Sequence, residues 1–360
     1  MHDAIRDHYE RHPYPAYSLL ATVRPWDTYH LNLDALWTRF NGTPLPERGR
    51  ILLAGCGSFS PYPTSIANPS AAITALDLST RSLRRARLHA LLHGCRNIAY
   101  LAGDLADPSV APGPYHFIDS FGVIHHLADP LAGLRALERR LSPGGLLRLM
   151  VYSRGARREA EAIRFAMRFL KVRDVATLKR LVRRARPGSR FARYLEDSSE
   201  VGFDAGLADA FLHPHAVTYR IAELMALIGR TGLTPLRFVH HGALPEIGAE
   251  TARLEALERD RSAMPNFIVY LGKDAAGGCP LTGDAVLRLN PSLASCVGLR
   301  QLRQVAVAPR LGQENPLLDW AARRLLRRFR RPVRYGELDA AERTAVAPFL
   351  EALFLTAGDC

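Results

Sequence analysis

The feature that most constrains the fold of this chain is a regular alternation, over residues 50–153, of short apolar runs with stretches of helical periodicity. Such alternation is typical of repeated strand-helix-strand units, which build a parallel sheet covered by helices. Strands buried on both faces contain continuous apolar runs. Five segments fit this description: 50–54 (RILLA), 72–76 (AITAL), 98–101 (IAYL), 115–121 (YHFIDSF) and 146–152 (LLRLMVY).

Helices are expected between these strands, over 79–93 and 130–141, and the later pattern extends the same fold. It predicts a long basic helical region from about 153 to 185, a helix over 217–230 and one over 250–260, and strands over 236–239 and 266–271. Because a helix joins these two strands, we expect them to close the sheet. Segment 274–280 (DAAGGCP) is expected to be a linker before a smaller, mostly helical tail.

Composition indicates a globular protein without a membrane span. Of 360 residues, 48% are hydrophobic and 23% are charged, and no apolar run reaches 18 residues. The first residues do not follow a signal-peptide pattern, so a cytoplasmic location is expected. The five cysteines are scattered and never spaced as C-x-x-C, which predicts reduced thiols and neither a zinc ribbon nor a disulfide framework.

The net charge of +13 is concentrated in two segments. Residues 151–200 contribute +8, and residues 323–334 contain seven arginines. Two interpretations stay open: a landing site for an anionic partner such as RNA, an acidic peptide or a lipid surface, or solvated helix faces whose arginine stems cover apolar surface. We favour the second because no nucleic-acid-binding motif accompanies the charge.

Glycines and acids follow the first three predicted strands, at the sheet edge where ligands of parallel sheets bind. Gly55 and Gly57 permit a tight turn and a close approach of backbone to ligand. Asp77 ends the second strand, where a carboxylate can accept hydrogen bonds from both hydroxyls of a ribose, and Asp104 ends the third. A glycine pair alone is weak evidence, but acids in two consecutive units predict a nucleoside pocket.

These segments resemble, in order and spacing, the motifs of class I S-adenosylmethionine-dependent methyltransferases. The motifs are ILLAGCGS, ITALDLS, GD, FGVIHHLADP and LSPGGLLRLMVYS, over about residues 48–153. The last two resemble a bacterial branch that often opens with a Tyr-Pro-rich segment, like 9–15 here, and carries a segment like 211–214 before a tyrosine. The resemblance implies an α/β, Rossmann-like seven-stranded methyltransferase fold whose last strand is antiparallel, with a small C-terminal helical appendage.

The resemblance also implies a domain organisation and a cofactor, S-adenosylmethionine. Residues 1–47 would form a helical or lid segment, 48–273 the methyltransferase domain with a helical insertion over about 154–231, and 274–360 a linker and helical appendage. The two glycines would pass under the methionine part, Asp77 would hold the ribose, and Asp104 would lie by the adenine. The implied cofactor-binding residues are Gly55, Cys56, Gly57, Asp77, Leu78, Asp104 and Leu105.

Two departures from the family pattern stand out. Ser58 replaces the usual third glycine and begins a bulkier loop, 58–63 (SFSPYP). The fourth strand places its acid at Asp119 instead of near its start. We expect Asp119 to be a structural acid with a polar partner, because an unpaired carboxylate is costly in an apolar strand; a role in the pocket is the alternative.

Methyl transfer requires an in-line approach and, for hydroxyl or protonated nitrogen acceptors, a base. His125 and His126 follow the fourth strand and are the candidate bases, with loop packing as the alternative. The candidates for the substrate pocket, each of which packing would also explain, are Tyr14, Tyr17, Tyr152, His213 and Tyr219. No metal is predicted, because the His240–His241 pair has no third ligand nearby in the sequence.

The sequence therefore predicts methyl transfer from S-adenosylmethionine to an acceptor that it does not identify, a small molecule of specialised metabolism or a peptide. One alternative is a noncatalytic protein that keeps the fold as a platform for binding or assembly. Another is an RNA methyltransferase that uses the basic helices. The oligomeric state and the methylated atom do not follow from the residues.

Overall fold

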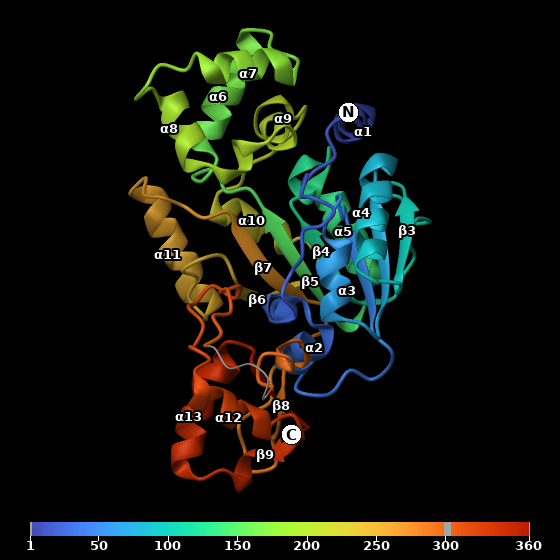
Figure 1. Cartoon of the computed structure of the whole chain (residues 1–360), viewed down its shortest axis with the longest axis vertical. Helices are drawn as coiled ribbons and strands as arrows, with labels where there is room; N and C mark the ends of the chain where they lie inside the picture. Colours follow the sequence, from blue (N-terminus) through green and yellow to red (C-terminus); the bar gives the residue numbers. More distant parts are fainter. Residues whose placement is uncertain (1, 299–303, 360) are drawn as a thin grey trace.

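The computed structural model describes residues 2–298 and 304–359 and is built on a seven-stranded sheet (Figure 1). The strand order is β3-β2-β1-β4-β5-β7-β6, and β7 alone runs antiparallel to its neighbours. This confirms the predicted fold. The strands are β1 (Arg50–Ala54), β2 (Ala72–Asp77), β3 (Ile98–Ala102), β4 (Tyr115–Phe121), β5 (Leu141–Val151), β6 (Thr234–Phe238) and β7 (Phe267–Gly272).

Helices cover both faces of the sheet, as the continuous apolar strands require. Adjacent strand residues alternate between two cores: Leu53 and Phe117 pack with α2, whereas Leu52 and Ile118 pack with α5, α10 and α11. The covering helices are α1 (His2–Arg11), α2 (Leu33–Asn41), α3 (Pro61–Ala67), α4 (Thr80–Leu92), α5 (Pro130–Arg140), α10 (Ile221–Ile228) and α11 (Ile247–Arg259).

The predicted long basic helix over about 153–185 is wrong in detail, because two shorter helices lie there, α6 (Arg158–Phe169) and α7 (Val175–Arg183). The helices α8 (Arg190–Asp197) and α9 (Asp204–Leu212) follow, and we call residues 158–212 the helical cap. The break after α6 has a local cause: the Asp174 side chain accepts a hydrogen bond from the backbone N–H of Thr177 and starts a new helix. The cap has a core of its own around Leu178 and Phe211, and in Figure 1 it lies at one end of the molecule.

The C-terminal appendage lies at the opposite end and differs from the mostly helical tail that we expected (Figure 1). Two helices, α12 (Trp320–Arg328) and α13 (Ala340–Glu351), accompany a small antiparallel sheet of order β10-β8-β9. Its strands are β8 (Val286–Leu289), β9 (Val333–Arg334) and β10 (Leu355–Gly358). Strands of two to four residues carry too little periodicity to be recognised from sequence.

Two further expectations concern thiols and membranes. Cys56, Cys95 and Cys296 are free and buried, but Cys279 is disulfide-bonded, which corrects the prediction of reduced thiols throughout. Within residues 2–298 and 304–359, none of the helices combines the length and apolar character needed to span a membrane.

Candidate functional site

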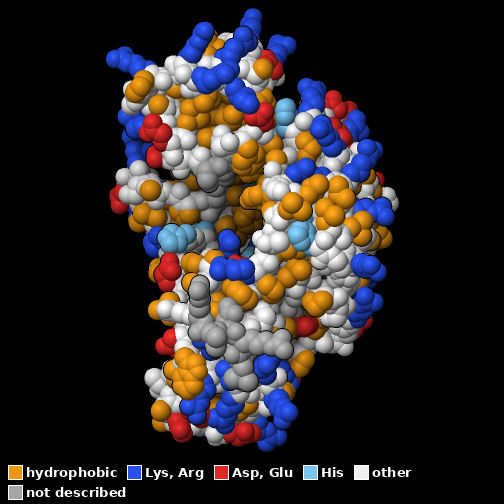
Figure 2. Space-filling view, viewed as in Figure 1, with side chains coloured by type: hydrophobic (Ala, Val, Ile, Leu, Met, Phe, Trp, Pro, Cys, Tyr) orange, Lys and Arg blue, Asp and Glu red, His pale blue; other side chains and the backbone are white. Residues whose placement is uncertain are grey.

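A cavity of about 900 Å³ lies at the carboxyl ends of the central strands, where ligands of parallel sheets bind. Its walls come from the turns after β1, β2, β3 and β4, from the N-terminal segment, and from the helical cap. Figure 2 shows a hollow near the middle of the molecule with hydrophobic side chains deep inside it. The residues that line the cavity are spread along the chain, from Ile5 to Gly312.

The turn after β1 requires glycine at two positions. Gly55 and Gly57 have φ angles of +81° and +57°, which side chains rarely adopt. A Cβ on Gly55 would lie 2.4 Å from Cγ2 of Val123, and one on Gly57 would lie 2.6 Å from the carbonyl oxygen of Tyr14. The two glycines therefore let the N-terminal segment and the turn after β4 approach the loop closely.

Asp77, at the end of β2, holds this turn in place. Its carboxylate accepts hydrogen bonds from the backbone N–H of Gly57 (2.7 Å) and of Ser79 (2.9 Å). Burial raises the pKa of Asp77, and the two backbone hydrogen bonds oppose that shift. Asp77 is half-buried in the cavity wall, so its carboxylate can also reach a ligand.

All seven predicted cofactor-binding residues line the cavity. Asp104 follows β3 and accepts a hydrogen bond from the backbone N–H of Ala106 at 2.8 Å, which fixes the orientation of its carboxylate. The bulky loop after Gly57 does not fill the cavity, because Pro61 begins α3 there. The structure thus brings together the residues that the motifs place at consecutive strand ends.

The N-terminal segment lies over the glycine turn. Ser58 donates its backbone N–H to the carbonyl oxygen of Tyr14 (3.1 Å) and its hydroxyl to that of Pro15. Tyr14 and Tyr17, the predicted lid residues, both line the cavity, and Tyr17 stays 50% exposed. The segment occupies the position that a lid over the cofactor end would need.

The two candidate bases lie in different surroundings. His126 lines the cavity, and its Nδ1 is 2.8 Å from the carbonyl oxygen of His215, so Nδ1 carries the ring proton and Nε2 the lone pair. Burial lowers the pKa of His126 to about 3. His125 is fully buried, does not line the cavity and packs against Tyr152, with ring centroids 3.8 Å apart.

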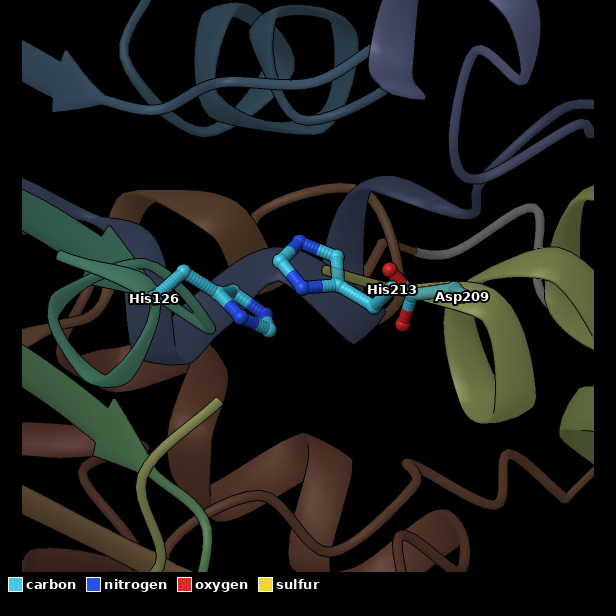
Figure 3. A group of neighbouring side chains, drawn as sticks. All are labelled: His126, Asp209 and His213. Carbon is cyan, nitrogen blue, oxygen red and sulfur yellow. The ribbon is translucent and has the colours of Figure 1, made fainter. Parts of the chain in front are cut away.

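Asp209, on α9 of the helical cap, is a cavity residue that the sequence analysis missed. It is 8% exposed and accepts hydrogen bonds from the phenols of Tyr9 (3.1 Å) and Tyr152 (3.5 Å), which also line the cavity. Figure 3 shows its carboxylate beside His213, whose ring packs against that of His126 with centroids 3.8 Å apart. We call Tyr9, His126, Tyr152 and Asp209 the acceptor-end cluster.

Two predicted pocket residues lie behind this cluster. His213 is 1% exposed and does not line the cavity, but its ring packs against those of His126 and Tyr9, which do. Tyr219 is buried outside the cavity wall, where its backbone N–H donates to the carbonyl oxygen of Tyr152 at 3.0 Å. Both support residues that line the cavity.

His126, Asp209 and His213 offer ligand atoms within 4.8 Å of one another, a grouping that spacing in the sequence does not reveal. An imidazole binds a metal in its own ring plane, whereas these two rings are stacked with an interplanar angle of 30°. We therefore assign no ion to them. At the His240–His241 pair, a carboxylate unnoticed in the sequence, that of Glu250, lies 2.7 Å from Nε2 of His240 and is also paired with Arg253.

Asp119 has the polar partner that the sequence analysis required. Arg148 on β5 donates two hydrogen bonds to its carboxylate, at 2.8 and 2.7 Å, across the β4–β5 pair. Asp119 is 5% exposed, whereas Arg148 reaches the cavity wall. The pair joins the two central strands beneath the cavity.

Parts of this chain resemble known proteins. Residues 29–185 match a family model described as a methyltransferase domain. An uncharacterised protein of Synechococcus is 31% identical over 247 residues, which are 65% of this chain and 59% of that protein. A ubiquinone biosynthesis O-methyltransferase of Paracidovorax citrulli is 31% identical over 115 residues, 32% of this chain and 48% of the enzyme. The chain thus spans about half to three fifths of these curated relatives.

The fold is shared with two solved structures of one protein. PKMT2 from Rickettsia typhi superposes with a TM-score of 0.57 over 93% of this chain and 76% of that protein, at 14% identity. Its complex with AdoHcy superposes with a TM-score of 0.54 over 96% of this chain and 77% of that one. Residues 29–185 thus match a methyltransferase domain, and the chain shares its fold with these two solved structures.

Proposed function

We propose that this chain, whose methyltransferase domain match covers residues 29–185, transfers a methyl group from S-adenosylmethionine to a small-molecule acceptor, with a peptide as the second acceptor class. The observation that carries the proposal is one cavity lined by two chemically different groups of residues. The first group is the glycine turn with Asp77 and Asp104, and the second is the acceptor-end cluster. A donor and an acceptor bound in one cavity gain the proximity that methyl transfer needs.

Asp77 is the residue on which cofactor binding should depend. A half-buried carboxylate at the end of β2 can accept hydrogen bonds from two ribose hydroxyls while the N–H groups of Gly57 and Ser79 hold it in place. The AdoHcy complex of PKMT2, which shares the fold, supports a cofactor of this kind. Asp104 is the corresponding candidate for the adenine side.

For a hydroxyl or protonated amine acceptor, His126 is the better of the two candidate bases because it lines the cavity and His125 does not. Its lowered pKa keeps the ring neutral at pH 7, which is the form that accepts a proton. A weak base suffices here, since the acceptor proton becomes strongly acidic as the new bond to carbon forms. Tyr9 and Tyr152 are candidates for orienting the acceptor.

The rival functions receive less support. A noncatalytic platform was favoured by the bulky glycine loop, but that loop leaves the cavity open. An RNA methyltransferase would rely on the basic helices, yet Arg323 is 4% exposed, Arg327 donates to the carbonyl oxygen of Val297, and Arg328 pairs with Glu342. Much of the charge on α12 therefore serves packing.

Calorimetry with S-adenosylmethionine and S-adenosylhomocysteine tests the proposal. We expect both to bind, and Asp77→Ala to weaken binding by about tenfold or more, because each unmade hydrogen bond of a buried polar group costs roughly 1–3 kcal/mol. Asp107→Asn is the matched control, since Asp107 follows the neighbouring strand β3 but is exposed and lies outside the cavity. Unchanged affinity in Asp77→Ala would refute the assignment, and failure of the unmodified chain to bind would favour the platform.

A further inference from the structure

The helix α6 of the helical cap carries two apolar faces, of which only one is packed. Its inner face, with Ile163 and Met167, lies in the core of the cap. The outer face repeats apolar residues at the spacing i, i+3, i+4, i+7 and i+8, which forms one continuous stripe along a helix. All five residues of this outer stripe are exposed: Ala162, Phe165, Ala166, Phe169 and Leu170.

The exposure of the large side chains on this stripe is unusual for a protein surface. Phe165 is 73% exposed, Phe169 79% and Leu170 59%. A core-facing helix of a soluble domain normally turns charged or polar residues to water on its outer side. An exposed apolar patch rimmed by polar residues marks an interaction surface.

The rim of the stripe is positive. Arg158, Arg168, Lys171 and Arg173 are all exposed around it. Within the described residues, the nearest acids are engaged elsewhere: Glu159 pairs with Arg190, Glu161 accepts a hydrogen bond from the Thr218 hydroxyl, and Asp174 caps α7. Figure 2 shows Lys and Arg side chains crowding the outer surface of the cap, with hydrophobic ones between them.

This combination of charge and apolar residues determines what can cover the stripe. A second copy of the chain would bring the same four cations against these, and like charges in contact oppose association. An anionic lipid surface offers both complements at once, because headgroups attract the cations and the acyl boundary accepts the phenylalanines. Helices with this composition lie in the interface plane of a membrane without crossing it.

We propose that the outer stripe of α6 docks the helical cap onto a membrane surface containing anionic phospholipid. Phe165, Phe169 and Leu170 would enter the headgroup boundary, and the rim of arginine and lysine would lie among the phosphates. The cap also supplies Asp209 to the cavity, so docking would bring one wall of the acceptor end close to the lipid. The proposal rests on the surface alone and does not require methyl transfer.

Vesicle flotation with the full-length chain tests the proposal. Vesicles of phosphatidylcholine alone are compared with vesicles in which phosphatidylglycerol replaces part of it. We expect binding to the anionic vesicles to exceed binding to the neutral ones by about tenfold or more, and to fall with added salt. Phe165→Ser/Phe169→Ser should reduce the bound fraction by about tenfold or more, because each lost phenyl group removes apolar area from the lipid boundary.

The matched control is Leu317→Ser/Trp320→Ser in the C-terminal appendage, where both side chains are 65% exposed beside the other basic segment. This variant should bind like the unmodified chain, and circular dichroism melting should show that both variants fold. Three results would overturn the proposal: no binding to anionic vesicles, equal binding by the Phe165/Phe169 variant, or light scattering that shows a dimer which this variant dissociates.

Discussion

Replacing Asp119 with Asn should destabilise the protein strongly, because it leaves Arg148 without a countercharge between the central strands. The carboxylate is 5% exposed and accepts two hydrogen bonds from one guanidinium. Removing one partner of a buried ion pair typically costs 3–5 kcal/mol. The side chain of Arg148 is 12% exposed at the cavity wall, where water can solvate part of its charge, so we expect the lower end, about 3 kcal/mol.

Thermal melting followed by circular dichroism measures this effect. A loss of about 3 kcal/mol should lower Tm by roughly 4 °C, because a chain of 360 residues unfolds with an entropy of roughly 0.76 kcal/mol/K. Glu159→Gln is the control, because Glu159 makes an equally short two-bond pair with Arg190, with side chains 46% and 61% exposed. Such surface pairs contribute about 1 kcal/mol or less. Asp119→Leu/Arg148→Met should recover much of the loss, and an Asp119→Asn protein that melts within about 2 °C of the unmodified chain would refute the reasoning.

Three other predictions concern the loop, the base and the charge. Gly57→Ala should reduce affinity for S-adenosylhomocysteine, measured by calorimetry, since its Cβ would lie 2.6 Å from the carbonyl oxygen of Tyr14 at a φ of +57°; equal affinity would contradict this account of the turn. His126→Gln should lower turnover about 10²–10⁴-fold at nearly constant cofactor affinity once an acceptor is known, whereas His125→Gln should mainly lower Tm; full turnover in His126→Gln would exclude the base. RNA should bind weakly and without sequence preference in filter binding at physiological salt, and tight binding that reversal of the α12 arginines abolishes would favour an RNA substrate.

Acidification below about pH 6.5 should destabilise the protein, because buried histidines take up protons less readily in the folded chain than in the unfolded one. Burial lowers the pKa of His126 to about 3 and that of His8 to about 4. Between these values and the ordinary histidine pKa of about 6.5 the unfolded chain binds more protons than the folded one, so stability rises with pH across that window. Denaturant titrations at pH 7 and pH 5 check the sign; equal stability at the two values would show that the histidines are solvated in the folded protein.

The parallel part of the fold could be predicted from the sequence because its signals are local. The continuous apolar run of 115–121 became β4 with the same bounds, and the start of α5 follows from Asp129 and Pro130. Prediction failed in the helical cap, although one of its start signals is local. The cap helices α8 and α9 were not recognised, and the basic run after residue 153 concealed the break at Asp174.

The candidate cofactor residues of the cavity could be predicted more fully than the acceptor-end cluster, because their positions depend on the sheet alone. Gly55, Gly57, Asp77 and Asp104 all follow strands of one parallel sheet, so topology alone brings them to one edge.

The acceptor-end cluster depends instead on how the helical cap folds back over the sheet. Asp209 is 57 residues from Tyr152 and 200 from Tyr9, yet it hydrogen-bonds to both. In the sequence it is one acid in a mostly apolar stretch, 204–212 (DAGLADAFL), with no periodicity that points it toward a strand end. Because the cap is inserted between β5 and β6, its side chains can change without disturbing the strand ends that hold the cofactor residues. Asp209→Asn, which removes the charge but keeps the shape, therefore separates an acceptor role of the cap from cofactor binding.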